Sequence, residues 1–264
     1  MKFDGDHLGR LLAGKAMGQR VHFMDEVDST NTYASMLARE GAREGEVVIA
    51  DRQLRGKGRI GRTWQSPAGD NLYISIILRP PVRPAVSPQI TLMAGVATAE
   101  ALTGYCGRDV TLKWPNDVRI RDLKVCGILT EMRLRAAEID FVIVGIGINI
   151  NMKKGDFDEA FRELSTSLRE ELGREVSRDD VTVRLLECFD KWYRIFLAEG
   201  FPPVREKWMD YAGILGREIQ VQSGTQMQKG KALGIDEEGA LLLLDDGGQT
   251  RRVLSGDVLL TEGL

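Results

Sequence analysis

The stretch KWPNDVRIRDLKVCGILTEMRLRAAEIDFVIVGIGINI, residues 113–150, decides the fold of this chain. It holds two runs rich in β-branched residues, at 124–132 and 139–150, and a third lies at 110–114. Valine, isoleucine and threonine are stiff at χ1, so they fit the pleated surface of a sheet better than the surface of a helix. The three runs therefore predict three strands.

Helices and further strands are predicted on both sides of this stretch. Strands are predicted at 46–50 and 71–78, and helices at 33–40, 91–102, 157–170, 181–198 and 204–211. Asp28 or Ser29 would cap the first helix. From about Gly213 short strands at 217–222, 229–235, 240–244 and 251–254 alternate with Gly, Ser and Asp turns, which predicts a small SH3-like β-barrel. We therefore divide the chain into an α+β domain, 1–212, and a C-terminal domain, 213–264.

The bulk composition of the 264 residues excludes several classes of protein. The net charge of −3 gives no overall attraction to nucleic acid or to an anionic membrane. Cys106, Cys126 and Cys188 form no CxxC pair, which favours a reducing compartment without structural zinc. His7 and His22 lie outside any motif. Residues 1–20 do not have the pattern of a signal peptide and no apolar run could span a bilayer, so we expect a cytoplasmic protein.

The segment Gly56-Lys57-Gly58-Arg59-Ile60-Gly61-Arg62-Thr63-Trp64 has the composition of an anion-binding loop. Its three glycines let backbone amides approach an anion, and its three cations supply charge. It nearly matches a Walker A loop, but Arg62 stands where lysine is required and a strand follows where a helix is required. A phosphate-binding loop of that class is therefore rejected, and the alternative is a mobile loop with solvated charges.

Three further segments carry candidate chemistry. One of them, Lys113-Trp114-Pro115-Asn116-Asp117, puts a cation, an amide and a carboxylate on one turn. The turn is either functional or an ordinary β-turn in which Asn116 and Asp117 hydrogen-bond to the local backbone. Strand alternation predicts Lys124 on one face with Cys126 and Ile128, as either an edge-strand charge or a phosphate ligand. Gly127 suggests a close approach to the backbone. The segment Gly145-Ile146-Gly147-Ile148-Asn149 is not a dinucleotide fingerprint, so its glycines would make room for a ligand ring or for close packing.

Taken in order, these segments resemble the biotin–protein ligase family. The family pattern runs Ser-Thr-Asn, then Gln before a Gly-Arg-Gly-Arg-x-Gly-Arg-x-Trp loop, then Lys-Trp-Pro-Asn-Asp, Lys-x-x-Gly-Ile-Leu and Gly-x-Gly-x-Asn. The match covers residues 27–151, and the C-terminal β-module is also similar. The resemblance implies a class II synthetase-like α+β fold, in which helices back a mixed β-sheet and a small SH3-like barrel follows.

The resemblance also implies an activity and a set of site residues. The enzyme would form biotinyl-5′-AMP from biotin and ATP, with Mg²⁺ on the phosphates, and pass biotin to a lysine of a biotin carboxyl carrier protein. The biotin-binding residues would be Ser29, Thr30, Asn31, Gln53, Gly56, Lys57, Arg59, Gly61, Trp64, Lys124 and Gly127. The adenylate-binding residues would be Arg59, Arg62, Trp64, Asn71, Lys113, Asn116, Lys124, Gly147 and Asn149. Lys124, Arg59 and Asp117 would be catalytic, with Asp117 as either base or orienter.

One departure and several alternatives accompany this assignment. Lys57 stands where the family usually has arginine, which keeps the charge but loses the bidentate fork. A lipoate–protein ligase would be similar in fold and reaction, but its typical Arg-Arg-x-Ser-Gly-Gly-Gly loop is absent. A DNA-binding repressor is not expected, because the 27 residues before Asp28 are too few for a winged helix. A non-catalytic binding protein would tolerate loss of the cations. The sequence does not identify metal ligands, and it leaves open whether the protein forms a homodimer.

Overall fold

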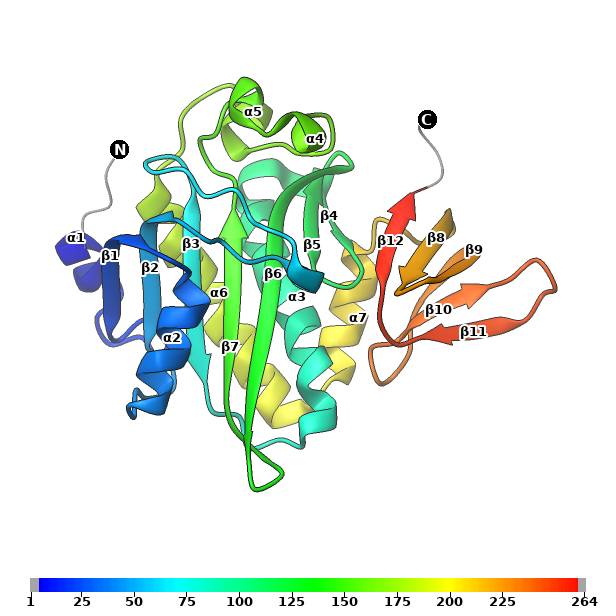
Figure 1. The fold of residues 1–264 in the computed structure, drawn as a ribbon, viewed down its shortest axis with the longest axis horizontal. Helices are drawn as coiled ribbons and strands as arrows, with labels where there is room; N and C mark the ends of the chain where they lie inside the picture. The colour runs from blue at the N-terminus through cyan, green and yellow to red at the C-terminus, as the bar shows by residue number, and fades with distance from the viewer. Residues whose placement is uncertain (1–4, 261–264) are drawn as a thin grey trace.

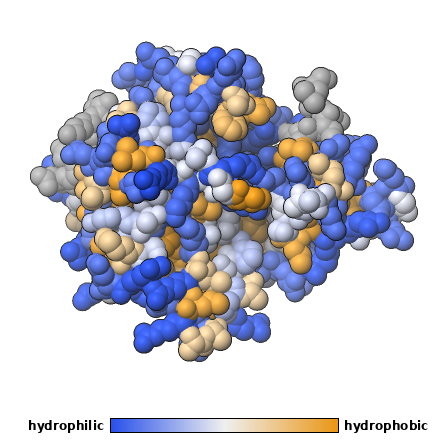
Figure 2. Space-filling view, in the orientation of Figure 1, coloured by the Kyte–Doolittle hydropathy of each residue, from blue (hydrophilic) through white to orange (hydrophobic). Residues whose placement is uncertain are grey.

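The computed structural model of this protein describes residues 5–260 (Figure 1). Residues 1–4, which begin both the predicted α+β domain and the segment without a signal-peptide pattern, lie outside the described residues. Residues 261–264, which end the predicted C-terminal domain, lie outside them as well. None of the helices in the described part is long and apolar enough to cross a membrane. On the face shown in Figure 2, apolar residues form small patches among hydrophilic ones.

A seven-stranded sheet forms the centre of the larger domain. Its order is β1 (Val21–Val27), β2 (Val47–Gln53), β3 (Leu72–Leu78), β7 (Glu138–Ile148), β6 (Leu123–Arg135), β5 (Asp117–Ile120) and β4 (Val110–Lys113). β1 and β2 run parallel, and every other neighbouring pair is antiparallel. The sheet is therefore mixed, as predicted.

Helices cover both faces of this sheet, and strand alternation decides which residues meet them. α3 (Ser87–Cys106), α6 (Arg178–Glu199) and α7 (Pro202–Tyr211) pack together behind the sheet, while α2 (Thr30–Arg39) lies in front (Figure 1). Val48 and Ile77 join the small apolar cluster under α2. Their neighbours Val47 and Ile76 face the large core on the other side. α1 (Gly5–Leu11) packs beside β1 and α6.

The C-terminal SH3-like module is a five-stranded antiparallel sheet. Its order is β11 (Thr250–Val253), β10 (Leu241–Leu244), β9 (Gln226–Ile235), β8 (Glu218–Ser223) and β12 (Asp257–Leu260). The predicted division at 212/213 falls between α7 and β8. Trp114 joins the two parts, because its Nε1 donates to the carbonyl of Gly239 at 3.1 Å. The module therefore borders the Lys-Trp-Pro-Asn-Asp turn.

The predicted helix at 157–170 is wrong. Two short helices, α4 (Glu159–Arg162) and α5 (Leu168–Leu172), are separated by a segment that pairs with β6. Lys124 N donates to Leu164 O, and Thr166 N donates to Lys124 O, both at 2.9 Å. Ser167 then caps α5 by accepting from Glu170 N. This backbone pairing overrides the amphipathic pattern on which the prediction relied.

The prediction that Lys124 shares a face with Cys126 and Ile128 is also wrong, because β6 carries a bulge. Arg119 lies opposite Lys124 and Val118 opposite Cys126, so Val125 is an extra residue in β6. A β-bulge of this kind shifts the later side chains to the opposite face. Lys124 therefore lies on the front face with Gly127, where a Cβ would be 3.4 Å from Lys124 Nζ. The lysine consequently faces the cavity described below.

The sequence also missed several elements. It did not predict α1, β1, β5 or β12, nor four short 3₁₀ segments: Arg59–Gly61, Pro84–Val86, Gly107–Asp109 and Lys154–Asp156. The remaining predicted helices and strands are confirmed, with ends shifted by a few residues.

Candidate active site

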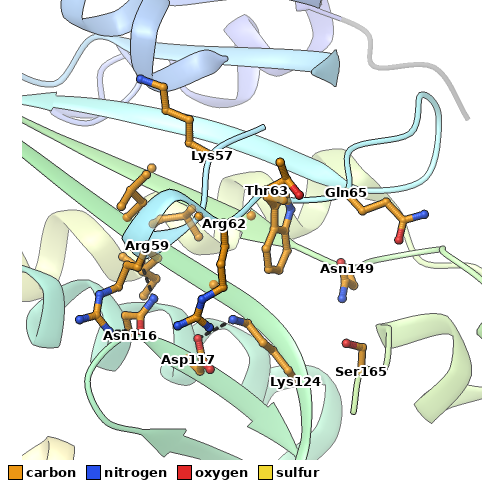
Figure 3. Close-up of a pocket in the computed structure, with 18 of the residues that line it drawn as sticks. Lys57, Arg59, Arg62, Thr63, Gln65, Asn116, Asp117, Lys124, Asn149 and Ser165 are labelled. Atoms are coloured by element: carbon orange, nitrogen blue, oxygen red, sulfur yellow. Dashed lines mark hydrogen bonds and ion pairs between the residues drawn. The ribbon is translucent and has the colours of Figure 1, made fainter. Parts of the chain in front are cut away.

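A cavity of about 210 Å³ opens on the front of the sheet, where β6 and β7 meet the 54–66 loop and β12 (Figure 3). Most of the sequence-predicted site residues line it: Ser29, Thr30, Asn31, Gln53, Lys57, Arg59, Arg62, Trp64, Lys113, Asn116, Asp117, Lys124, Gly127, Gly147 and Asn149. Gly56, Gly61 and Asn71 do not line it. Segments far apart in the sequence are thus brought to one place.

Two paired glycines form the floor of the cavity, and the Trp64 ring lies on them. Gly127 of β6 stands opposite Gly147 of β7. A Cβ on Gly147 would lie 2.5 Å from Trp64 Nε1, and one on Gly127 would lie 2.9 Å from Trp64 Cζ3. Only glycine therefore lets the indole approach both strands. The buried Nε1–H has no acceptor among the described residues, which is a cost of packing the ring on this floor.

One end of the cavity is neutral and densely hydrogen-bonded. The Thr30 backbone N and Oγ1 both donate to Gln53 Oε1, at 2.9 and 3.1 Å. Gln53 Nε2 donates to Ser66 Oγ at 2.9 Å, which fixes the orientation of the amide. Ser29 is the N-cap residue of α2 but does not cap it with its side chain. Within the described residues no hydrogen bond involves the Ser29 hydroxyl, so this end offers a free polar group.

Asn31 has its amide engaged by the scaffold. Its Oδ1 accepts from Ser75 Oγ at 2.6 Å, and its Nδ2 donates to the Leu129 carbonyl and to Glu131 Oε2. A Cβ on Gly145 would lie 2.1 Å from Asn31 Oδ1, so Gly145 makes room for this side chain. Asn31 therefore joins α2 to the sheet beneath the cavity.

The opposite end is charged and centres on Asp117, the first residue of β5. Lys124 Nζ lies 2.6 Å from Asp117 Oδ1 (Figure 3). Lys113 Nζ lies 3.5 Å from Asp117 Oδ2. Burial favours the neutral acid, but Lys124 and Lys113 together hold the pKa of Asp117 below its ordinary value. Burial lowers the pKa of Lys113, and Asp117 opposes that shift. Lys124 Nζ also lies 5.4 Å from the centre of the Trp64 ring.

The glycine- and arginine-rich loop folds back on itself over the cavity. Trp64 N donates to Gly56 O and Gly58 N donates to Arg62 O, at 2.9 and 2.7 Å. Ile60 stands at the tip with φ 55° and ψ 44°. For an L-residue this conformation costs roughly 1–2 kcal/mol. The closed loop must therefore be held by contacts elsewhere.

Gly56 and Gly61 shape this loop rather than line the cavity. A Cβ on Gly56 would lie 2.3 Å from Trp64 O, and Gly61 has φ 72°. Lys57 points away from the other cations (Figure 3) and pairs with Glu131 at 3.6 Å. Gln65 joins the loop to the segment before α4, because its Nε2 donates to Asp156 O at 2.8 Å and its Oε1 accepts from Asp158 N at 3.0 Å.

Asp257, which the sequence analysis missed, completes the charged end from the C-terminal module. Its carboxylate pairs with Arg59 at 3.3 Å and also contacts Arg62. Arg59 donates to the Gly256 carbonyl at 3.3 Å as well. Nothing in the local sequence marks this aspartate, because the residues that it contacts are nearly two hundred positions away in the chain.

The predicted site asparagines all make structural hydrogen bonds. Asn116 Nδ2 donates to Ile128 O at 2.8 Å while its Oδ1 accepts from Arg59 at 3.2 Å, so the turn is tied to β6 and to the loop. Asn149 Nδ2 donates to Thr166 O at 3.1 Å. Asn71 is fully buried and accepts from Ile150 N at 2.9 Å.

His22 pairs with Glu46 away from this cavity, and the side chain of His7 is outside the described part of the structure.

The acidic residues of the cavity do not form a metal cage. No group of three His, Cys, Asp or Glu side chains that could hold a metal occurs among residues 5–260. Asp117 and Asp257 are each paired with two cations. A divalent ion here would depend on phosphate oxygens for its remaining ligands.

Comparison with known proteins gives consistent matches along the chain. The model of the biotin/lipoate A/B protein ligase family matches residues 23–149, and that of the biotin protein ligase C-terminal domain matches residues 214–260. The bifunctional ligase/repressor BirA of Bacillus subtilis is 38% identical over 94% of this chain and 76% of its own length. The biotin–(acetyl-CoA-carboxylase) ligase of Paracoccus denitrificans is 34% identical over 84% of this chain and 93% of its own.

A solved structure is similar over almost the whole fold. The biotin protein ligase of Aquifex aeolicus, in complex with biotin and ATP, aligns with a TM-score of 0.78 and 31% identity. The alignment covers 93% of this chain and 100% of that one. Both domains described above therefore have counterparts in that protein.

Proposed function

This chain belongs to the biotin protein ligase family, and from that premise we propose how its residues form biotinyl-5′-AMP from biotin and ATP and then transfer biotin to a carrier lysine. One observation carries the proposal: a single cavity has a neutral hydrogen-bonding end and a cationic end, with an aromatic ring between them. Biotin has a neutral ureido head, an apolar tail and a carboxylate, so its polarity matches the cavity from end to end.

Biotin binds with its ureido group at the neutral end. Ser29 offers a free hydroxyl, while Thr30 and Gln53 hold fixed donor and acceptor atoms beside it. Fixed polar groups in a mostly apolar pocket give orientation and specificity. The Trp64 ring, which lies on the glycine floor, contacts the tail, and Lys124 beside the ring receives the carboxylate.

Adenylate formation joins two anions, because a biotin carboxylate oxygen attacks the α-phosphorus of ATP and pyrophosphate leaves. Lys124, Lys113 and Arg59 supply positive charge at this end of the cavity. Preorganised charges of this kind stabilise the transition state without reorganising. Alignment of the two reactants can contribute roughly 7–11 kcal/mol to lowering the barrier. We expect Mg²⁺ on the ATP phosphates, where it would offset part of their negative charge.

Transfer follows when a neutral lysine amine of the carrier attacks the acyl carbon and AMP leaves. With a reference pKa of about 10.4, a free lysine is deprotonated at pH 7 at a cost of roughly 4.6 kcal/mol. Asp117 is a poor base for this step, since its two lysine partners lower its pKa. We assign it the orienting role: it holds Lys124 and Lys113 apart and directs both amines to the cavity.

The competing functions have less support. The lipoate alternative lacks its loop motif, and the Paracoccus denitrificans relative and the Aquifex aeolicus structure are both named as biotin ligases. A non-catalytic binding protein would not need the cations gathered around Asp117. A biotin carboxyl carrier protein as acceptor, a cytoplasmic location, a homodimer and the absence of specific DNA binding all stay predictions.

The direct test is to incubate the chain with ATP, Mg²⁺, biotin and a biotin carboxyl carrier domain. Intact-mass spectrometry should show one biotinyl group added to the carrier. Controls omit ATP, replace biotin with lipoate, or use a carrier whose acceptor lysine is changed to arginine, and each should abolish the addition. Labelling with lipoate in place of biotin would overturn the substrate assignment.

A further inference from the structure

The C-terminal module reaches into the cavity with one carboxylate, and this carboxylate holds two cations of the loop. Asp257 Oδ1 lies 3.3 Å from Arg59 Nη1, and Asp257 Oδ2 contacts Arg62 Nη2. The side chains of Asp257 and Arg59 are only 24% and 22% exposed, so solvent screens their pair incompletely. Arg59 and Arg62 are thus both engaged by the same anion.

A carboxylate that accepts from two guanidinium groups resembles a bound phosphate chemically. Arginine uses the same planar set of donors for carboxylates and for phosphates. Donors that point at Asp257 cannot at the same time point at a phosphate in the cavity. The protein therefore contains its own competitor for the cations that the nucleotide needs.

The same contact also helps to hold the loop closed. Ile60, between the two arginines, has the left-handed backbone conformation that L-residues avoid. The closed loop consequently needs attachments outside itself, and the two arginines on either side of Ile60, Arg59 and Arg62, both contact Asp257. Together with the Gln65 contacts to Asp156 and Asp158, the Asp257 contact therefore limits how far the loop can open.

We infer that Asp257 is a positioning residue: it occupies Arg59 and Arg62 while the site is empty, keeps the loop over the cavity, and yields both arginines to a phosphate of incoming ATP. The identity of that anion rests on the proposed function, whereas the attachment of the loop does not. Nucleotide binding would thereby release the loop from the C-terminal module.

The start of β12 is built so that this carboxylate is placed reproducibly. Gly256 has φ 149°, and a Cβ there would lie 2.7 Å from Val221 Cγ1 and 2.8 Å from Gln222 O. Asp257 is paired with Gln222 in the sheet, and Lys113 Nζ donates to the Val258 carbonyl at 2.9 Å. The backbone on both sides of Asp257 is therefore fixed, and only its side chain needs to change partner.

The first measurement is the KM for ATP in biotin-dependent pyrophosphate exchange with Asp257→Asn. This variant is isosteric but gives up the charge, so the arginines should be freer and the KM for ATP should fall about three- to tenfold, with kcat less affected. Asp257→Glu keeps the carboxylate and should stay near the wild-type value. Asp246→Asn is the matched control, because Asp246 is exposed in the same module. A KM that rises in Asp257→Asn would overturn the inference, since Asp257 would then support nucleotide binding.

The second measurement needs no activity and uses the empty protein. Trypsin should cut after Arg59 or Arg62 several-fold faster in Asp257→Asn than in wild type or Asp246→Asn, because the loop loses its anchor. Equal cleavage rates would refute the attachment. If trypsin cleaves Asp257→Asn faster but the wild type catalyses no pyrophosphate exchange, the attachment of the loop is retained and the proposed function is refuted. Circular dichroism and the unfolding midpoint establish that each variant is folded.

Discussion

Gly147→Ala tests the floor of the cavity most sharply, since it adds one methyl group where the Trp64 ring lies. The new Cβ would be 2.5 Å from Trp64 Nε1, so the ring must move by about 0.9 Å before ordinary contact at 3.4 Å is restored. β7 is hydrogen-bonded to β3 and β6 along its length, whereas Trp64 belongs to a loop. The loop should therefore yield, and the sheet should not.

The expected result is a selective loss of biotin binding. A misplacement of this size near reacting groups can cost about 100-fold, so the KM for biotin in pyrophosphate exchange should rise about 10- to 100-fold. The free energy of unfolding should change by less than about 1 kcal/mol, because the core is not repacked. Gly155→Ala is the matched control, since a Cβ there would meet no atom within 4 Å.

Two outcomes would contradict this reasoning. A folded Gly147→Ala protein with an unchanged KM for biotin would show that the indole does not contact the ligand. A large drop in the unfolding midpoint at normal KM would show that the strand moves instead of the loop.

Three further perturbations test other parts of the site. Lys124→Ala should slow biotin-dependent pyrophosphate exchange by about 100-fold or more while the fold survives, and near-normal exchange would identify Lys124 as a plain surface charge. Because Lys124 and Lys113 hold the pKa of Asp117 below its ordinary 3.8, its carboxylate stabilises the fold above that pH, and the contribution is lost as the pH falls through the depressed pKa. The difference in urea unfolding free energy between wild type and Asp117→Asn should thus be constant near neutral pH and shrink below about pH 4; a difference that persists in acid argues against this. Gln65→Ala should raise the KM for ATP several-fold with little change for biotin, because it detaches the loop from Asp156 and Asp158, and the exposed Gln226→Ala serves as control.

The sequence alone determined the features that depend on local chemistry. β-Branched runs predicted the strands β4, β6 and β7, because χ1 stiffness acts within a few residues. The glycines at 127, 145 and 147 predicted a close approach, because a missing Cβ is visible without any partner. The order of the motifs gave the resemblance to the ligase family, and most of the residues quoted for it line one cavity.

Tertiary structure decided what depends on partners far apart in the chain. The bulge at Val125, set by pairing with β5, turned Lys124 to the front face, and pairing with Lys124 broke the predicted helix at 157–170. Asp257 entered the site only because β12 packs beside the loop, a contact between residues 198 positions apart. The pKa of Asp117 depends on Lys113 and Lys124, which are near it in sequence but reach it because β4 and β6 pair on either side of β5. Strand propensity is a property of neighbouring residues, whereas the direction and charge environment of a side chain are set by whichever segments fold against it.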